Sequence, residues 1–573
     1  MERNERPLNE HRQLGVVVIL ILGVLLLFHC KLSFCQSDES FYTALAHRLW
    51  MGDRLIVDEW HPAQLYAPIL LPFYSLFRAA VPDGTGVYLF ARRMYVLFSL
   101  IVSLSFYFFL SRKTSTWAAC MTAVLPLLYS RANISGPSYY NLCLQFTILA
   151  LVLACASKKR IAWILSGFFL ALAVLCMPFL APFVMLGVLA LLFFPGSRQK
   201  SIFLLLGILF SATVYLLFLI QSSTVSQLYS SIGQLFKDSQ HQDSLYEMAK
   251  RVYRGFRSCL SPLTYPVLVV ACLIVLFSEK KTIKEHLDAF RIVYLFLVVL
   301  LTGATAMKAI NSICFAVSVP VALLSMPFAL KDMLKKEKSI ALIMFLSGYA
   351  MAGAFALGSN TGLDAMTVGF TLSAAGGLLL ITQSCSPNML CKRESAFAIR
   401  ALVICIGLIM IGTFSAHRFW GIYRDAPITE LTAQIEDGPA AGLYTTDSHA
   451  EEYAMIHSTI RRYHAQYPDA RVLFSKRLPW GYVASDWGCA DYTAWTTPIN
   501  DPRLLEYYVD HSEPNIIFLL ADDTTSYESV PFNNHREAHN MNQNPLEGLF
   551  YQSLVDKGIL LEQTPVVTVF WLG

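Results

Sequence analysis

Residues 14–42 read LGVVVILILGVLLLFHCKLSFCQSDESFY, a long apolar run followed by two adjacent carboxylates, Asp38 and Glu39. An apolar run of about 20 residues is long enough to cross a bilayer as an α-helix. The run is too long for a signal peptide and has no Ala-x-Ala cleavage site, so we expect a retained first transmembrane helix. The acid pair then stands where a membrane helix ends and a loop begins, as an interfacial feature or as a functional site.

The composition of the whole chain indicates a membrane protein. Of its 573 residues, 55% are hydrophobic and only 15% are charged, whereas soluble domains carry roughly 25% charged residues. The net charge of +4 comes without a basic arm, so we expect no nucleic-acid partner. The sequence has neither a GxGxxG motif nor a P-loop, and we therefore expect no nucleotide cofactor.

The apolar runs predict an all-α polytopic domain with about thirteen transmembrane helices. The runs lie near 14–35, 87–110, 115–131, 139–156, 161–177, 179–195, 201–221, 262–278, 288–307, 311–330, 339–358, 366–383 and 397–415. Every second short loop is rich in Lys and Arg, which predicts a cytoplasmic N-terminus in the plasma (inner) membrane. An odd number of spans places the rest of the chain after about His417 on the outer face. Two larger loops, the first outer loop (36–86) and the second outer loop (222–260), lie on that face too.

The composition changes near Trp420 to that of a soluble domain. We therefore divide the chain into a transmembrane domain, 1–418, and an extracytoplasmic α/β domain, 419–573. Strands are expected near 442–445, 471–474, 515–520 and 566–571, with helices at 451–467 and 502–511. Strands that alternate with helices favour a small α/β domain.

The acid pair admits three kinds of chemistry. It can act as a general base on a hydroxyl, hold a divalent metal ion, or line a transport path. The predicted spans are nearly free of acids, and Asp364, the clearest exception, falls in a short outer loop. Because transporters usually carry ionisable groups in mid-membrane, this distribution favours an enzyme at the outer face.

The first outer loop carries a motif of a known enzyme class. A first span followed by Asp38-Glu39-x-x-Tyr42, then Ala46, Gly52-Asp53 and a proline-containing second half resembles the GT-C glycosyltransferases. The similarity covers the first 140 residues and the topology, and is nearest to the protein O-mannosyltransferases and the lipid A aminoarabinose transferase. It implies a GT-C-like fold and inverting transfer of a sugar from a polyprenyl-phosphate donor. The acceptor would be a hydroxyl of a lipid, a protein or a wall glycan.

The resemblance assigns roles to individual residues. Asp38 becomes the catalytic base or the residue that orients the acceptor, and Glu39 its partner, with a divalent metal ion between them left open. Arg92 or Arg93 would bind the donor phosphate, since a guanidinium matches phosphate oxygens. Lys308, near the outer end of a span, is a second phosphate candidate, or a side chain that reaches the headgroups. The remaining candidate substrate or loop residues are Tyr42, Asp58, Glu59, His61, Gln64, Arg131 and Tyr139.

One departure leaves the substrate branch open. The aminoarabinose branch has a Lys-Pro-Pro motif late in this loop, and here the stretch is His61-Pro62-Ala63-Gln64. Two other functions remain as alternatives. One is a transporter or flippase of lipid-linked sugars or polysaccharide. The other is an O-antigen-ligase-like glycan polymerase, which would depend on external Arg and His residues in place of Asp38.

Overall fold

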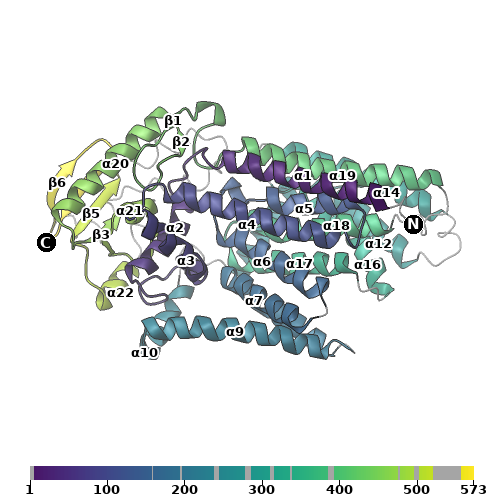
Figure 1. Ribbon diagram of the computed structural model, residues 1–573, viewed down its shortest axis with the longest axis horizontal. Coiled ribbons are helices and arrows are strands. Elements are labelled where there is room, and N and C mark those ends of the chain that lie inside the picture. The colour runs from purple at the N-terminus through teal and green to yellow at the C-terminus, as the bar shows by residue number, and fades with distance from the viewer. Residues whose placement is uncertain are drawn as a thin grey trace.

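The computed structural model consists of a helical bundle with a group of β-strands at one end (Figure 1). It describes residues 5–157, 159–193, 196–237, 244–277, 286–309, 315–335, 339–384, 393–474, 478–495, 503–520 and 557–573. We call the end of the bundle that carries the strands the sheet end. The N-terminus lies at the opposite end (Figure 1).

Within the described residues, eight helices are long and apolar enough to cross a membrane. They are α1 (Glu5–His29, apolar from Arg12), α4 (Val87–Leu110), α6 (Tyr139–Ala156), α9 (Arg198–Ser222), α14 (Leu287–Ala309), α17 (Ile340–Gly358), α18 (Leu363–Ser384) and α19 (Arg393–Trp420, apolar from Ser395). A ninth span results if α11 (Leu245–Cys259) and α12 (Thr264–Leu276), which meet at 93°, are counted as one. The chain therefore has the helices of a multi-pass membrane protein.

The expected number of about thirteen spans is not confirmed. Three apolar helices of the bundle are shorter than a span: α5 (Thr116–Leu128), α7 (Arg160–Cys176) and the pair formed by η4 (Pro178–Leu180) and α8 (Ala181–Phe193). The predicted span 311–330 begins in residues outside the described ones and continues as two short helices, α15 (Ser318–Leu324) and α16 (Met326–Leu334). The length of an apolar run does not predict a span in these cases, because prolines and loops divide the runs into shorter helices.

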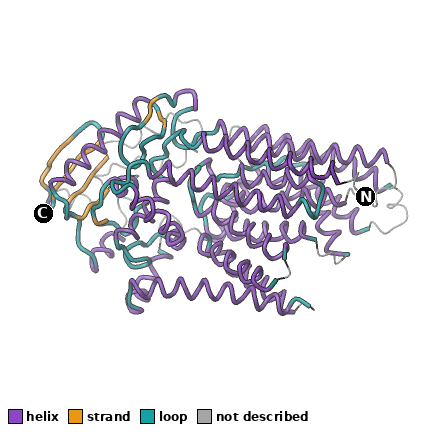
Figure 2. The backbone as a smooth tube through the Cα atoms, viewed as in Figure 1, coloured by secondary structure: helices purple, strands orange, loops and turns teal. Residues whose placement is uncertain are grey.

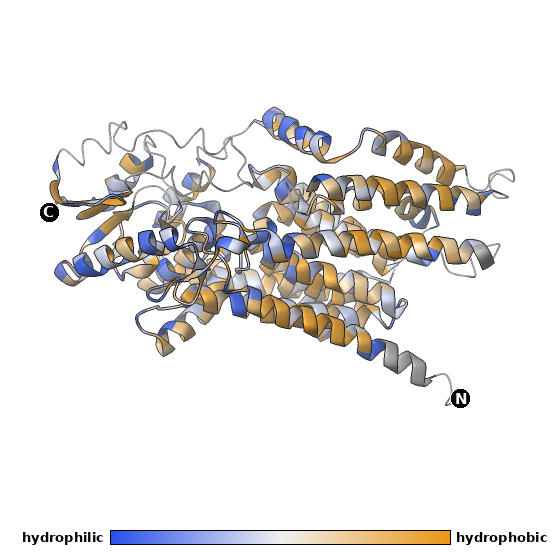
Figure 3. Cartoon of the chain, turned by 90° about the horizontal axis from the view of Figure 1, so that it is seen from above, coloured by the Kyte–Doolittle hydropathy of each residue, from blue (hydrophilic) through white to orange (hydrophobic). Residues whose placement is uncertain are grey.

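The bundle is organised around α18. In this helix 94% of the apolar window is buried, mainly against α17, α15 and α5. A Cβ added to Gly348 of α17 would overlap Ser373 of α18, so this pair of helices packs at backbone distance. Hydrophobic residues cover the bundle and hydrophilic ones gather toward the sheet end (Figure 3). The lipid-facing part and the polar part of the chain are thus separated along its long axis.

The first outer loop folds into α2 (Asp38–Met51), η2 (Pro62–Tyr66) and α3 (Ala67–Ala80). Helix α2 is buried from Asp38 to Arg48 because α3 and the C-terminal region cover it. Gly52 ends α2 in the left-handed conformation, with φ of 103°, which suits a residue without a Cβ.

The C-terminal region contains a five-stranded mixed sheet with strand order β4-β3-β5-β7-β6 (Figure 2). The strands are β3 (Arg471–Phe474), β4 (Gly488–Cys489), β5 (Ile516–Leu520), β6 (Ile559–Gln563) and β7 (Val567–Trp571). Strand β3 is parallel to β4 and β5, and β7 is antiparallel to β5 and β6. The short strands β1 (Ala433–Gln434) and β2 (Tyr444–Thr445) form a separate pair. Helices α20 (Asp447–Gln466), α21 (Pro479–Ala484) and α22 (Arg503–Asp510) complete the region.

The predicted strands correspond to β2, β3, β5 and β7, and the predicted helices to α20 and α22. The elements β1, β4, β6 and α21 were not expected from the sequence. Short connecting helices lie at the sheet end: η3 (Arg131–Asn133), α10 (Val225–Ser231), η5 (Ile232–Phe236) and η7 (Ile428–Glu430). The domain boundary at 418/419 stays a prediction.

Candidate active site

Asp38 opens α2 at the sheet end of the bundle and is 8% exposed. Its Oδ2 atom accepts hydrogen bonds from Nη1 of Arg424 at 2.6 Å and from the hydroxyl of Tyr423 at 3.1 Å. The hydroxyl of Ser37 lies 3.3 Å from the same oxygen. Both distant partners belong to the segment that follows the last membrane helix, α19. Asp38 therefore lies at the junction of the bundle, the first outer loop and the C-terminal region.

Glu39 forms a separate ion pair with Arg92. Its two carboxylate oxygens accept hydrogen bonds from Nε and Nη2 of Arg92, each at 2.5 Å. Arg92 also donates to the carbonyls of Cys30, Leu32 and Ser33, at 2.8, 2.9 and 3.0 Å. All five N–H groups of the guanidinium are thus used. Arg92 thus ties α4 to the segment after α1 and to Glu39, and its role as one of the two candidate ligands of the donor phosphate stays a prediction.

The same geometry bears on a metal ion between the two acids. Asp38 and Glu39 bind different arginines, Arg424 and Arg92. Among the residues that the structure describes, no group of three or more His, Cys, Asp or Glu side chains could hold a metal. A divalent ion needs several oxygen ligands that face one point, so a metal ion between these two acids stays a prediction.

Two tyrosines, Tyr42 and Tyr423, lie between the electrostatic influence of Asp38 and that of a cation, Arg131. Nε of Arg131 donates to Asp364 at 2.9 Å, and its guanidinium lies 4.4 Å from the ring centre of Tyr140. Burial raises the pKa of Tyr42 and of Tyr423 well above 10, and Asp38 raises both further while Arg131 opposes the shift. Both hydroxyls are therefore neutral hydrogen-bond donors near neutral pH.

Four predicted residues of the first outer loop hold the fold around the site. Asp58 accepts hydrogen bonds from Arg54 and from His511, the residue directly after α22, at 2.8 and 3.0 Å. Burial opposes its ionisation, yet the hydrogen bonds from His511 and Arg54 keep the pKa of Asp58 well below its usual value. Glu59 is paired with Arg48 at 2.7 Å, and burial raises its pKa. These two acids therefore fasten the loop to the C-terminal region.

His61 and Gln64 have local roles in the same loop. Nδ1 of His61 accepts a hydrogen bond from the backbone of Ala63 at 3.1 Å and so caps η2. Gln64 is fully buried and bonds the backbone of Ile56 and Glu59. These contacts shape the turn between α2 and α3.

The other predicted residues differ in their distance from the acid pair. Tyr139 packs edge-on to Tyr42, with ring centres 5.9 Å apart, so both belong to the aromatic wall of the site. Arg93 is exposed on α4. Lys308 is exposed near the end of α14. It is close enough to Cys259, at the end of α11, for its charge to act on that thiol.

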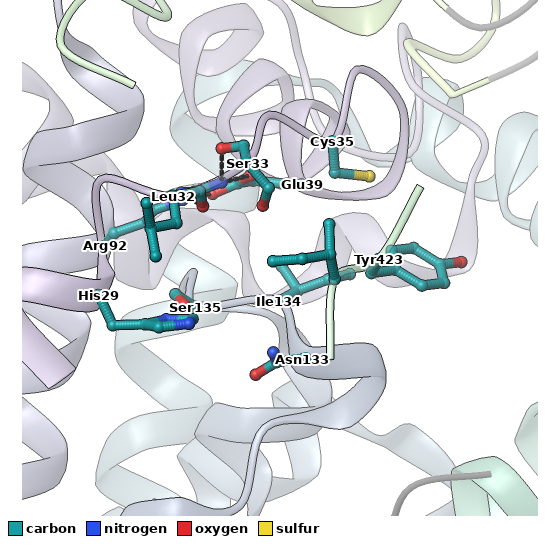
Figure 4. Close-up of a pocket in the computed structure, with 11 residues that line it drawn as sticks. His29, Leu32, Ser33, Cys35, Glu39, Arg92, Asn133, Ile134, Ser135 and Tyr423 are labelled. Atoms are coloured by element: carbon teal, nitrogen blue, oxygen red, sulfur yellow. Dashed lines mark hydrogen bonds and ion pairs between the residues drawn. The ribbon is translucent and has the colours of Figure 1, made fainter. Parts of the chain in front are cut away.

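A small polar cavity lies beside Glu39 and Arg92 (Figure 4). Its lining includes His29, Glu39, Arg92, Asn133, Ser135 and Tyr423. The volume of about 10 Å³ is enough for about one water molecule. The cavity is therefore too small for a sugar.

Strained backbone is concentrated around this junction. Four of the five non-glycine residues with positive φ among the described ones are Ser33, Ala132, Asn133 and Arg424, with φ of 65°, 53°, 55° and 54°. Ser33 and Asn133 line the small cavity, and Arg424 binds Asp38. Such conformations cost energy and cluster at functional sites.

Sequence reasoning missed Arg424 and Tyr423, the two partners of Asp38. The only local signal was the polar run Tyr423-Arg424-Asp425 directly after the last span. Asp425 accepts a hydrogen bond from the backbone of Phe34 at 2.8 Å and binds His449 at 2.9 Å. Three consecutive residues of this linker thus contact the short stretch 34–38, where the first outer loop begins.

Comparison with known proteins adds little. No family model matches the chain, and no curated protein matches it. The chain is similar to the crystal structure of the Archaeoglobus fulgidus oligosaccharyltransferase in the apo form, with 12% sequence identity and a TM-score of 0.45. The alignment covers 89% of this chain and 69% of that chain. This TM-score is too low to establish a shared fold.

Proposed function

We propose that the chain is a membrane glycosyltransferase of the GT-C type. It would move a sugar from a polyprenyl-phosphate donor to an acceptor hydroxyl at the outer membrane face. Asp38 would accept the proton of that hydroxyl. The single observation that carries the proposal is the placing of Asp38, a buried carboxylate at the sheet end of an apolar bundle, held by Arg424 and Tyr423.

The reaction is a single displacement at the anomeric carbon. The acceptor oxygen forms a bond to this carbon while the bond to the donor phosphate oxygen breaks, which inverts the configuration. The acceptor proton passes to Asp38, and polyprenyl phosphate leaves. A carboxylate within hydrogen-bond reach of the hydroxyl is what such general-base assistance requires.

Arg131 is the cation that best fits the leaving phosphate. It is 7% exposed and uses Nε on Asp364. Within the described part of the chain, its two Nη groups make no hydrogen bond. A guanidinium that is already in place stabilises the charge that develops on the phosphate, without reorganisation during the reaction. Arg131 is therefore the first candidate for binding the donor phosphate, because the guanidinium of Arg92 is occupied by Glu39. Arg93 and Lys308 remain further candidates for the same phosphate.

The test is a transfer assay with the purified full chain in liposomes and a panel of polyprenyl-phosphate sugars. Wild type should release polyprenyl phosphate. Asp38→Asn should lower the rate by about 10²-fold or more, the size typical of a lost general base. Asp83→Asn is the matched control, since Asp83 is an exposed acid of the same loop and accepts hydrogen bonds from Thr85, two residues later.

Each variant is first checked for an unchanged thermal unfolding midpoint, so that a loss of activity reports chemistry. Turnover that survives Asp38→Asn would refute the assigned base. Transport of a lipid-linked sugar without any glycosidic bond formed would instead show a flippase.

A further inference from the structure

Helix α11 differs from the other described helices of the bundle in its charge and its direction. Its sequence LYEMAKRVYRGFRSC contains four basic residues and one acid. It meets the apolar helix α12 at 93°, across a break of at most four residues. Helix α12 packs against α14, α15 and α16 of the bundle. With α12 along the bundle, the 93° bend turns α11 toward the plane of the membrane surface.

One face of α11 is packed against the bundle. Phe256 contacts Phe370 of α18, with ring centres 5.9 Å apart. Gly255 lies so close to Leu363, at the start of α18, that an added Cβ would be 2.6 Å from the Cβ of that leucine. These contacts fix α11 at the sheet end, beside Asp364.

A second face carries alternating aromatic and basic side chains. Tyr246, Lys250, Tyr253 and Arg257 follow one another at spacings of four, three and four residues, which places them on one stripe of the helix. We call these four residues the Tyr/Lys stripe. Tyr246 and Tyr253 are 71% and 61% exposed, and Arg257 is exposed. Lys250 lies 5.5 Å from the ring centre of Tyr246.

The stripe combines the two side-chain classes that occupy membrane–water interfaces. Tyrosine has an apolar ring and a polar hydroxyl, which suit the headgroup region. Lysine and arginine reach from there to phosphate groups. Arg251 lies on another face of α11 and packs against Gly362, so that face is turned toward the bundle. The stripe therefore faces away from the packed surface.

We propose that the Tyr/Lys stripe of α11 binds the anionic headgroups of the surrounding bilayer. The partner is a lipid surface with a negative charge, such as one rich in phosphatidylglycerol. Charge complementarity and the 93° junction of α11 with the apolar helix α12 support this partner. The inference does not depend on the proposed reaction.

The test compares the full chain in nanodiscs of phosphatidylcholine with the full chain in nanodiscs that also contain phosphatidylglycerol. Amide hydrogen exchange of residues 245–259 is the measurement. Each basic side chain near an anionic surface contributes about fivefold in binding. We therefore expect phosphatidylglycerol to slow exchange in this segment by up to about 25-fold for two cations. High salt should reduce the effect, since it screens exposed charges.

Three variants sharpen the test. Lys250→Gln with Arg257→Gln should abolish the phosphatidylglycerol response. Lys250→Arg with Arg257→Lys keeps both charges and should retain it. Arg461→Gln with Lys557→Gln is the control, because it removes two exposed positive charges from the C-terminal region; this pair should respond like wild type.

Equal exchange in the two kinds of nanodisc would overturn the proposal. The same slowing caused by inorganic phosphate in phosphatidylcholine discs would show a simple anion site and would also overturn it. If Lys250→Gln with Arg257→Gln speeds exchange equally in both lipids, the stripe has only a structural role, and the proposal fails.

Discussion

Arg92 and Arg93 are neighbours in the sequence but differ in their surroundings. The side chain of Arg92 is 3% exposed and makes five hydrogen bonds, two of them to Glu39. Arg93 is exposed on the same helix. Because a buried charge is costly when its partner is removed, the two arginines should contribute unequally to stability.

We expect Arg92→Gln to lower the free energy of unfolding by about 3–5 kcal/mol, since it leaves Glu39 buried without its cation. Arg93→Gln is the matched control and should change stability by about 0.5 kcal/mol or less. Denaturant unfolding of the purified chain in detergent is the measurement. Equal losses for both variants would contradict the structural role assigned to Arg92.

At this scale the sequence predicted the acids but not their partners. Asp38 and Glu39 follow the first apolar run, so their position at a membrane end could be read locally. Arg424 is 386 residues from Asp38 in the sequence. A contact over such a separation is set by tertiary packing, and no local pattern reports it.

Helices α7 and α9 approach each other through two glycines. A Cβ on Gly167 would overlap the carbonyl oxygen of Leu204, and one on Gly207 would overlap that of Ile164. Small residues at such positions let helix backbones pack closely in membranes. The sequence predicted both helices, but it did not show which of their faces meet.

Gly207→Ala should therefore force α7 and α9 apart and destabilise the chain by about 1–3 kcal/mol, the usual cost of overpacking. Gly187→Ala on the neighbouring helix α8 is the control, because nothing lies within 4 Å of its added Cβ. The thermal unfolding midpoint of each variant in detergent gives the comparison. A Gly207→Ala protein as stable as the control would show that the helices can separate at no cost.

At the scale of the whole molecule, the C-terminal region is fastened to the first outer loop by buried polar contacts. Arg48 bonds the carbonyl of Asp491, and Glu59 accepts from the backbone of Ala494. Arg78 is paired with Asp486 at 2.9 Å. The region is thus held by the fold of the loop, and the two should unfold together.

His47 makes this junction sensitive to pH. The pKa of His47 is lowered to about 4, mainly by burial. The positive charges of Arg78 and Arg48 also lower this pKa, whereas the negative charge of Asp486 raises it. The unfolded chain therefore binds a proton near pH 6.5 that the folded chain does not bind until about pH 4. Stability from this group is present above pH 6.5 and is lost as the pH falls toward 4.

We expect His47→Gln to flatten the pH dependence of unfolding between pH 6.5 and 4, by on the order of 3 kcal/mol at the acid end. Burial raises the pKa of Asp53 and of Glu59, which gives the opposite slope near pH 4. Because both acids are present in both proteins, the difference between wild type and variant isolates His47. Parallel curves for the two proteins would contradict the assignment.

The sequence by itself determined the helices and their apolar character, because hydrophobic length is a local property of the chain. It also placed Asp38 and Glu39 at the end of the first membrane helix, and it predicted four of the seven strands in the C-terminal region.

Only the tertiary structure decided which arginine meets which carboxylate, and it paired Arg92 with Glu39. It likewise buried α2 beneath the C-terminal region. These outcomes depend on contacts between segments far apart in the chain. Hydrophobic periodicity predicts that one face of a helix will be buried. Only the tertiary structure shows which segment of the chain covers that face.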